Sequence, residues 1–324
     1  MSVSEKNSTF ACIKIYKNSA MKTLKHTFFA TLAAIVPLAA CTHAPNLPES
    51  PRRVSAGRLY EMRMFSPEMN DTIVVDVWTP DGYNTRMRHH VVYMHDGQNL
   101  FDADATWNRQ SWNMDSTTRQ LIDQKTIPPT IIVGIHSKAA TRIGDLMPQK
   151  LMDAVHNDTT RATLDDMSGG QYRGEAYLTF IAHTLKPEID RLFATDPAPA
   201  ATSIMGSSMG GLISLAAMAE YPDVFGAAAC LSTHINNPGE HGGLYEALKI
   251  YMTDHLHLDH TRRLYLDCGD QTVDADYTPY FDDMAARIDS LCTAEMQVQF
   301  FPGDEHSEQC WERRVAIPLA FIAR

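Results

Sequence analysis

Residues 206–211 read Gly-Ser-Ser-Met-Gly-Gly and lie between an apolar-leaning run and a segment of helical character. A serine at a sharp strand-to-helix turn is held in a strained conformation, so the residues two before and two after it must be small. Gly206 and Gly210 meet that requirement around Ser208. The pattern predicts that Ser208 is a nucleophile for acyl transfer, with the backbone N–H of Met209 facing the oxyanion. A glycine-rich connecting loop is the alternative interpretation.

A serine nucleophile needs a base, and in folds with this turn the partners follow in the order serine, carboxylate, histidine. Of the chain's 14 histidines, only His306 lies beyond the next strand-like segment, 263–268. It occupies a polar loop after a further strand-like segment, 296–301. We therefore predict that His306 is the general base rather than a solvated loop side chain.

The predicted acid lies on the loop that follows residue 268, where three carboxylates are available. We expect Asp276 to be the N-cap of a helix over 277–291. Asp267 alternates with apolar neighbours inside the preceding strand and is expected to be structural. The residues themselves leave Asp270 and Asp274 as open alternatives for the acid.

Several segments carry a resemblance to a known family. They are 92–101 (VYMHDGQNLF), 112–115 (WNMD), 185–190 (LKPEID), 206–211, 221–226 (YPDVFG) and 303–306 (GDEH) with Trp311. Along most of its length the chain resembles the esterase D and enterochelin-esterase-like branch of the α/β-hydrolase superfamily. This branch is a group of serine carboxylesterases, so the resemblance implies an α/β-hydrolase fold.

The resemblance also implies a nucleophile, a base and two oxyanion donors, which are Ser208, His306 and the N–H groups of Met209 and Gln98. Many relatives carry the acid three residues after the strand-end glycine, where this chain has Thr272. Members with a longer loop favour Asp274 over Asp270. Acyl-enzyme chemistry of this kind requires no metal and no organic cofactor.

The N-terminal region has the architecture of a signal peptide, with a basic segment at 21–25 and an apolar run at 28–40. The apolar run is 13 residues long, short of the roughly 20 that a membrane-spanning helix needs. Its end, Leu-Ala-Ala followed by Cys41, resembles a bacterial lipobox and implies lipidation of Cys41. Ordinary signal cleavage is the alternative.

These features predict three parts of the chain. They are a leader region over 1–40 with the signal peptide at 21–40, a proline-rich extended tether over 41–55, and one catalytic domain over 56–324. We expect an exported lipoprotein, in the periplasm or at the cell surface, which associates with membrane only through its lipid. The net charge of −11 argues against binding to nucleic acid or an anionic membrane surface.

Two other groups of residues, three histidines and four cysteines, give weaker signals of function. The histidines 255, 257 and 260 could suggest a metal site, but a helix would splay them and no second cluster is paired with them. Four cysteines of the domain, at 230, 268, 292 and 310, allow three disulfide pairings. The sequence decides neither the pairing nor the oligomeric state.

The order of elements predicts an α/β fold with a mostly parallel sheet flanked by helices. Segments 58–65 and 71–78 alternate like half-buried strands, and buried strands separated by helical stretches follow, at 91–94, 130–135, 203–205 and 227–231. Residues 137–174 interrupt this order. We interpret them as either a flap over the site or a disordered surface insertion.

We expect a serine carboxylic-ester hydrolase that acts on an ester of a carbohydrate, a phenolic acid or a siderophore. Trp107, Trp112 and Trp311 could line a pocket for such a substrate, although core packing would also explain them, and Trp311 is expected to support the loop of His306. Two alternatives remain. One is an acyltransferase with the same site, and the other is a surface lipoprotein that binds glycan without catalysis.

Overall fold

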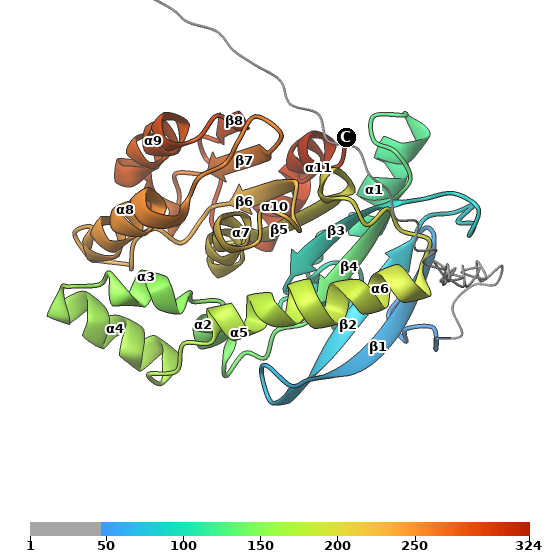
Figure 1. Cartoon of the computed structure of the whole chain (residues 1–324), viewed down its shortest axis with the longest axis horizontal. Coiled ribbons are helices and arrows are strands. Elements are labelled where there is room, and N and C mark those ends of the chain that lie inside the picture. The colour runs from blue at the N-terminus through green and yellow to red at the C-terminus, as the bar shows by residue number, and fades with distance from the viewer. Residues whose placement is uncertain (1–46) are drawn as a thin grey trace, which may run out of the picture. The chain divides into compact units, whose positions relative to one another are not determined.

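The computed structural model describes residues 47–324, so the leader region and Cys41 lie outside the described residues. An eight-stranded sheet runs through this part of the chain in the order β1-β2-β4-β3-β5-β6-β7-β8 (Figure 1). Its strands are β1 (Arg58–Ser66), β2 (Asp71–Thr79), β3 (His90–His95), β4 (Thr130–Ile135), β5 (Thr202–Ser207), β6 (Ala227–Leu231), β7 (Arg263–Cys268) and β8 (Glu295–Phe300). β2 pairs antiparallel with both β1 and β4, and every other neighbouring pair is parallel. The predicted mostly parallel sheet is confirmed.

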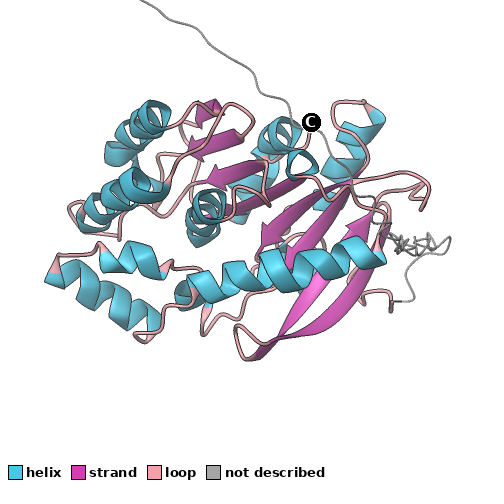
Figure 2. Cartoon of the chain, in the orientation of Figure 1, coloured by secondary structure: helices cyan, strands magenta, loops and turns pink. Residues whose placement is uncertain are grey.

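Side chains of the central strands point alternately to two hydrophobic cores. In β3, Val91 and Tyr93 enter one core, while Val92 and Met94 enter the other. Because helices cover both faces (Figure 2), β3 is apolar at four consecutive positions, 91–94, and not only at alternate ones. Because β3 to β8 run parallel, their carboxyl ends lie at one edge of the sheet, and the predicted site residues follow these ends.

The helices divide between the two cores. The larger core is covered by α3 (Gln149–Asp153), α4 (Asp158–Ser168), α5 (Gly174–Thr179), the π-helical segment η3 (Phe180–Leu185), α6 (Lys186–Leu192), α7 (Met209–Glu220), α8 (Gly243–His255) and α9 (Asp274–Leu291). The smaller core is covered by α1 (Met114–Asp123), α10 (Glu308–Arg314) and α11 (Ala316–Ile322). α5, η3 and α6 form one continuous helical run across the antiparallel end of the sheet (Figure 1).

The segment between β4 and α5 is ordered, so the interpretation of residues 137–174 as a disordered insertion is wrong. It contains α2 (Arg142–Asp145), α3 and α4. Leu151 and Leu164 are fully buried, and this packing explains why the segment folds. Gly169 and Gly170 adopt positive φ at the end of α4 and stop that helix.

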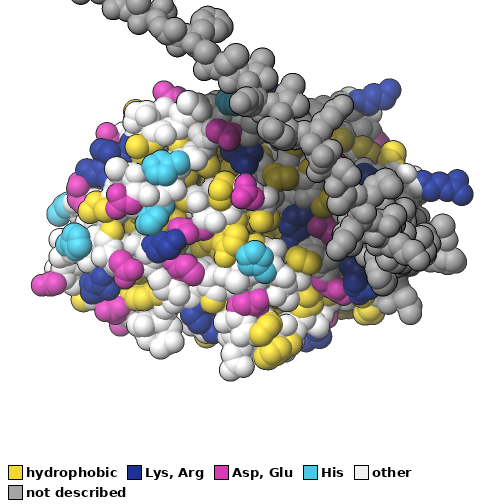
Figure 3. All heavy atoms as spheres, in the orientation of Figure 1, with side chains coloured by type: hydrophobic (Ala, Val, Ile, Leu, Met, Phe, Trp, Pro, Cys, Tyr) yellow, Lys and Arg dark blue, Asp and Glu magenta, His cyan; other side chains and the backbone are white. Residues whose placement is uncertain are grey.

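The last residues of the expected tether lie against β1. Ser50 donates its backbone N–H to Leu59 at 2.8 Å, and Glu49 forms an isolated bridge with Tyr60. Within residues 47–324 no helix is both long and apolar enough to cross a membrane. The four cysteines of this part, 230, 268, 292 and 310, are all free thiols. On the face shown in Figure 3, acidic and basic side chains are interspersed.

Candidate active site

Ser208 stands alone between β5 and α7 in a conformation that L-residues rarely adopt, with φ 58° and ψ −121°. Its N–H donates to the carbonyl of Leu231 at 2.9 Å, and its carbonyl accepts from Leu212 at 3.1 Å. A Cβ at Gly206 would lie 2.9 Å from the backbone of Gly210, so the turn requires glycine there. The strained serine and its close backbone contacts form the predicted strand-to-helix turn.

The buried side chain of His95 packs against Gly206 and Gly210 of this turn. The hydroxyl of Ser214 donates to the Gly210 carbonyl at 2.7 Å, so it accepts from Nε2 of His95 at 3.1 Å. Tyr177 then donates to Nδ1 at 2.7 Å. Burial lowers the pKa of His95 to about 4, so the ring is neutral at physiological pH. His95 therefore fixes the glycine-rich turn by packing and hydrogen bonding, a role that the sequence analysis missed.

His306 lies on the loop after β8, and its Nδ1 is 2.6 Å from Oδ1 of Asp274. Asp274 is the first residue of α9 and its side chain is completely buried. Its other oxygen, Oδ2, accepts from the Gly269 N–H and the Ser232 hydroxyl, both at 2.7 Å. These three hydrogen bonds fix the carboxylate against one edge of the imidazole.

The structure distinguishes Asp270 from Asp274, the two residues that the sequence left as alternatives for the acid. Asp270 accepts the backbone N–H of Gly303 at 2.8 Å and belongs to the exposed part of the loop. Asp276 is not the N-cap of the helix, so that prediction was wrong. The helix begins at Asp274, because hydrogen bonds such as Asp276 N–H to the Val273 carbonyl at 3.0 Å close its first turn earlier.

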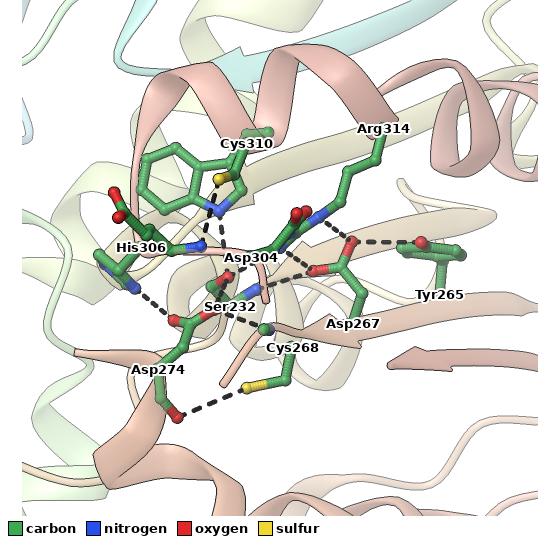
Figure 4. Close-up of polar contacts among 12 residues, drawn as sticks. Ser232, Tyr265, Asp267, Cys268, Asp274, Asp304, His306, Cys310 and Arg314 are labelled. Atoms are coloured by element: carbon green, nitrogen blue, oxygen red, sulfur yellow. Dashed lines mark hydrogen bonds and ion pairs between the residues drawn. The ribbon is translucent and has the colours of Figure 1, made fainter. Parts of the chain in front are cut away.

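A buried polar network contacts Asp274 through its Oδ2 atom, the oxygen that does not face His306 (Figure 4). The Ser232 hydroxyl donates to Asp274 and accepts from Nε1 of Trp311 at 3.0 Å and Nη2 of Arg314 at 2.9 Å. Arg314 is also ion-paired with Asp267 at 2.8 Å, and the two side chains are 3 % and 0 % exposed. Burial raises the pKa of Asp267, and Arg314 opposes that shift. Asp267 is thus structural, as predicted, and it fixes Arg314 behind Ser232.

Of the two predicted oxyanion donors, Met209 directly follows Ser208, and Gln98 lines the same cavity as Ser208. Met209 is the first residue of α7, where a helix leaves its N–H groups without intrahelical partners. Gln98 lies in the short helix η1 (Gly97–Asn99), and its side chain is bound to Ser137, donating to Oγ at 3.0 Å and accepting the N–H at 3.1 Å. The loop that carries Gln98 is therefore fixed to the segment after β4.

Asp96 precedes that loop in the left-handed conformation, with φ 56°. Arg142, at the start of α2, donates to both of its carboxylate oxygens at 2.7 Å, and the Ser137 hydroxyl donates to it as well. Burial alone would raise the pKa of Asp96, but the charge and hydrogen bonds of Arg142, with that of Ser137, lower it to about 2. Asp96 therefore links the loop of Gln98 to the segment 137–174.

Ser208 and His306 line one cavity of about 580 Å³. Its other walls are provided by polar and aromatic residues, including Asn99, Thr106, Trp107, Trp112, Glu308 and Trp311. Alanine is the only aliphatic residue type among the lining residues that the structure describes. Arg142 also lines the cavity, so the beginning of the segment 137–174 borders the site while the rest packs on the core.

Three tryptophans lie around the cavity in different environments. Trp112 and Trp311 are buried and pack together, with ring centroids 5.6 Å apart. The His306 ring stands edge-on to Trp311 at 4.9 Å, so Trp311 supports the loop of His306. Trp107 is 84 % exposed at the mouth of the cavity, which makes it available to a ligand.

Comparison with known proteins gives a consistent result. A family described as "Putative esterase" matches residues 66–314. Among curated proteins, YjcH of Bacillus subtilis is 24 % identical over 180 residues, which is 56 % of this chain and 63 % of YjcH. YbbA of the same organism is 25 % identical over 157 residues, which is 48 % of this chain and 54 % of YbbA. The match therefore spans less than two thirds of either relative, and both carry uncharacterized names.

Solved structures share the fold. A ferulic acid esterase has a TM-score of 0.59 at 16 % identity, covering 84 % of this chain and 98 % of its own. An IroE-like serine hydrolase from Shewanella oneidensis has a TM-score of 0.58 at 21 % identity, covering 81 % and 79 %. The enterobactin esterase FES from Shigella flexneri, in the presence of enterobactin, has a TM-score of 0.57 at 17 % identity, covering 86 % and 60 %. The predicted α/β-hydrolase fold is confirmed.

Proposed function

Since this chain belongs to the esterase family that matches residues 66–314, we propose that Ser208, His306 and Asp274 are its catalytic residues. The observation that carries the proposal is the 2.6 Å hydrogen bond between Asp274 and His306, beside a cavity that also contains the strained Ser208. A nucleophile on a strained turn, an imidazole and a buried carboxylate are the parts that serine ester hydrolysis requires.

The proposed reaction proceeds through an acyl-enzyme. His306 takes the proton of the Ser208 hydroxyl as Oγ attacks the ester carbonyl carbon, and Asp274 accepts the Nδ1–H that fixes the imidazole tautomer. The N–H groups of Met209 and Gln98 donate to the tetrahedral oxyanion, at about 3 to 4 kcal/mol of barrier each. The imidazolium returns the proton to the leaving alcohol. Water then attacks the acyl-enzyme by the same route and releases the acid.

The walls of the cavity support a substrate that contains rings and hydroxyl groups, and we propose an ester of a carbohydrate, a phenolic acid or a siderophore. Such substrates suit aromatic faces and polar side chains, whereas a long aliphatic acyl chain would need an apolar wall. Exposed Trp107 offers a flat surface at the mouth. Its neighbour Asn108 donates to Glu308 at 2.9 Å and so ties this loop to the start of α10.

We also propose that the protein is exported and lipidated at Cys41, on the strength of the apolar run and the lipobox-like ending before it. Metabolic labelling of the full chain with an alkyne-bearing fatty acid tests this. We expect wild-type protein to take up the label and Cys41→Ser to lose it. Equal labelling of both would contradict lipidation at this residue.

The proposed nucleophile is tested by labelling the purified domain with a fluorophosphonate probe, which reacts only with activated serines. We expect labelling of the wild type and none of Ser208→Ala. Ser207→Ala, from the same turn, is the matched control and should still be labelled. If a folded wild-type domain took no label, or if Ser208→Ala kept it, the proposed site would be wrong. Product analysis with a competing alcohol then separates hydrolysis from acyl transfer.

A further inference from the structure

Ser232 directly follows β6, is fully buried and has a positive φ of 41°, a backbone conformation that favours glycine. Its N–H donates to Asp267 twice, to the carbonyl oxygen at 2.9 Å and to Oδ1 at 3.1 Å, and so holds the backbone in this conformation. Because a glycine would adopt the same conformation without strain, the backbone gives no reason for a serine at this position. The reason must therefore lie in the hydroxyl group.

The neighbours of the Ser232 hydroxyl decide where its single hydrogen points (Figure 4). Nε1 of Trp311 lies 3.0 Å from Oγ of Ser232, and Nη2 of Arg314 lies 2.9 Å from it. An indole N–H and a guanidinium can only donate, so together they fill the two acceptor positions of the hydroxyl. The hydrogen is then directed to Oδ2 of Asp274 at 2.7 Å. The positive charge of Arg314 also polarises the hydroxyl, which strengthens this hydrogen bond.

This hydrogen bond fixes the orientation of the Asp274 carboxylate. Oδ2 accepts from the Ser232 hydroxyl and from the Gly269 N–H, both at 2.7 Å. Oδ1 is then left to face Nδ1 of His306 at 2.6 Å. The bond that carries a carboxylate group has no sharp rotational preference of its own. For Asp274, however, rotation would break two hydrogen bonds in the interior of the protein, where unpaired polar groups are costly.

We propose that Ser232 is a positioning residue, which acts through Asp274 on the imidazole of His306. It keeps the ring in the orientation and tautomer in which Nε2 can take a proton, and the inference therefore rests on the proposed function. Trp311 connects the two parts of this arrangement. Its N–H donates to Ser232, and its ring stands edge-on to that of His306, with centroids 4.9 Å apart.

Ser232→Ala removes the hydroxyl and keeps the Cβ atom. We expect kcat/KM for p-nitrophenyl acetate to fall about 10- to 100-fold, the value of one hydrogen bond to a charged group. The rate of fluorophosphonate labelling should fall with it. Ser203→Ala is the matched control, since the buried Ser203 hydroxyl donates to the Ile322 carbonyl at 2.9 Å. Ser203 lies near the start of β5, whereas Ser208 follows its end, so this variant should keep the wild-type kcat/KM.

The double variant with Asp274→Ala tests whether Ser232 acts through the carboxylate. When the carboxylate is absent, Ser232→Ala should cause no further loss of the residual activity. A serine that served only the stability of the fold would lower kcat/KM by the same factor in both backgrounds. Equal losses in the two backgrounds would therefore overturn the inference, as would a wild-type kcat/KM in Ser232→Ala.

Ser232→Gly provides the second test if circular dichroism shows that Ser232→Ala does not fold. Glycine adopts positive φ without strain, and this variant lacks the same hydroxyl. We expect its kcat/KM to fall by a similar factor in a folded protein. A folded Ser232→Gly variant with wild-type kcat/KM would contradict the role of the hydroxyl.

The labelling experiment separates this inference from the proposed function. A wild-type protein that neither hydrolyses ester nor labels at Ser208 would refute both. A wild-type protein that labels at Ser208 while Ser232→Ala labels equally fast would refute only the role of Ser232.

Discussion

The ion pair between Asp96 and Arg142 gives a stability prediction whose size follows from one pKa. The charge and hydrogen bonds of Arg142, with the hydrogen bond of Ser137, lower the pKa of Asp96 from 3.8 to about 2. That difference corresponds to roughly 2 to 3 kcal/mol of folding free energy at neutral pH. Asp96→Asn keeps the shape of the side chain and tolerates the left-handed conformation, but it removes the charge. We expect the variant to be less stable than the wild type by roughly 2 to 3 kcal/mol at pH 7.

The difference in unfolding free energy between the wild type and Asp96→Asn must also depend on pH. A carboxyl group whose pKa is lowered by folding stabilises the protein above its unfolded pKa, and the contribution is lost as pH falls through the folded pKa. For Asp96 the difference in unfolding free energy between the two proteins should stay near its full value down to about pH 5, fall to roughly half of that value near pH 3 and to a small fraction of it near pH 2. Above pH 5 the two stability curves should therefore run parallel.

Urea unfolding of the wild type and Asp96→Asn, followed by circular dichroism from pH 7 to pH 3, measures this. Arg142→Met should cost a similar amount, and combining the two substitutions should cost less than their sum because both break one pair. A difference below about 1 kcal/mol at pH 7, or one that does not shrink toward pH 3, would refute the reasoning.

Three further predictions concern other parts of the site. Asp274→Asn should lower kcat/KM for p-nitrophenyl acetate by about 10³- to 10⁴-fold, whereas Asp270→Asn should leave it within about twofold, and the reverse order would exclude Asp274 as the acid. Trp107→Ala should raise KM for feruloyl or acetylated sugar esters about 3- to 10-fold without changing the hydrolysis of p-nitrophenyl acetate, and equal effects on both substrates would argue against a ring-binding role. Arg314→Met leaves Asp267 buried and unpaired and should cost about 3 to 5 kcal/mol. Calorimetry should then show a drop of roughly 6 to 20 °C in Tm, partly restored by adding Asp267→Asn, and an unchanged Tm would contradict a stabilising role for the pair.

The serine turn and the histidine could be located from the sequence because their signals are local. Ser208 needs glycine at fixed positions on both sides, and the backbone contacts at Gly206 explain why. His306 could be selected because the order of elements along the chain restricts the base to the region after β7. Neither inference required knowledge of which distant segments touch.

The proposed acid, Asp274, and its supporting network depend on such distant contacts. Asp270 and Asp274 lie four residues apart in one polar loop, and only the early start of α9 turns Asp274 inward. Ser232 bonds to Asp274 from 42 positions away along the chain, and Arg314, 40 positions away on the other side, bonds to Ser232. A serine at a strand end and an arginine in a helix give no pattern by themselves, so sequence reasoning missed both.

The fold of residues 137–174 also depends on contacts that the sequence does not reveal. Its polar composition and glycine pair suggested either mobility or a flap, yet buried leucines at 151 and 164 hold its helices on the core. The two leucines lie in different short helices, α3 and α4, so they form no repeating apolar pattern along one helix. Packing against α8 and neighbouring helices decided the outcome, and that information is tertiary.

The proposed catalytic triad and the mouth of the cavity come from different parts of the chain. Ser208, Asp274 and His306 follow β5, β7 and β8, all in the second half of the chain. The mouth of the cavity, with Trp107 and Arg142, is built by loops after β3 and β4 in the first half. On this assignment, the loops that carry Trp107 and Arg142 can be remodelled toward a new ester while Ser208, Asp274 and His306 stay unchanged. Of the groups proposed to take part in the reaction, Gln98 lies in the first half. The choice of ester can therefore change through substitutions in these loops without a change in the proposed reaction.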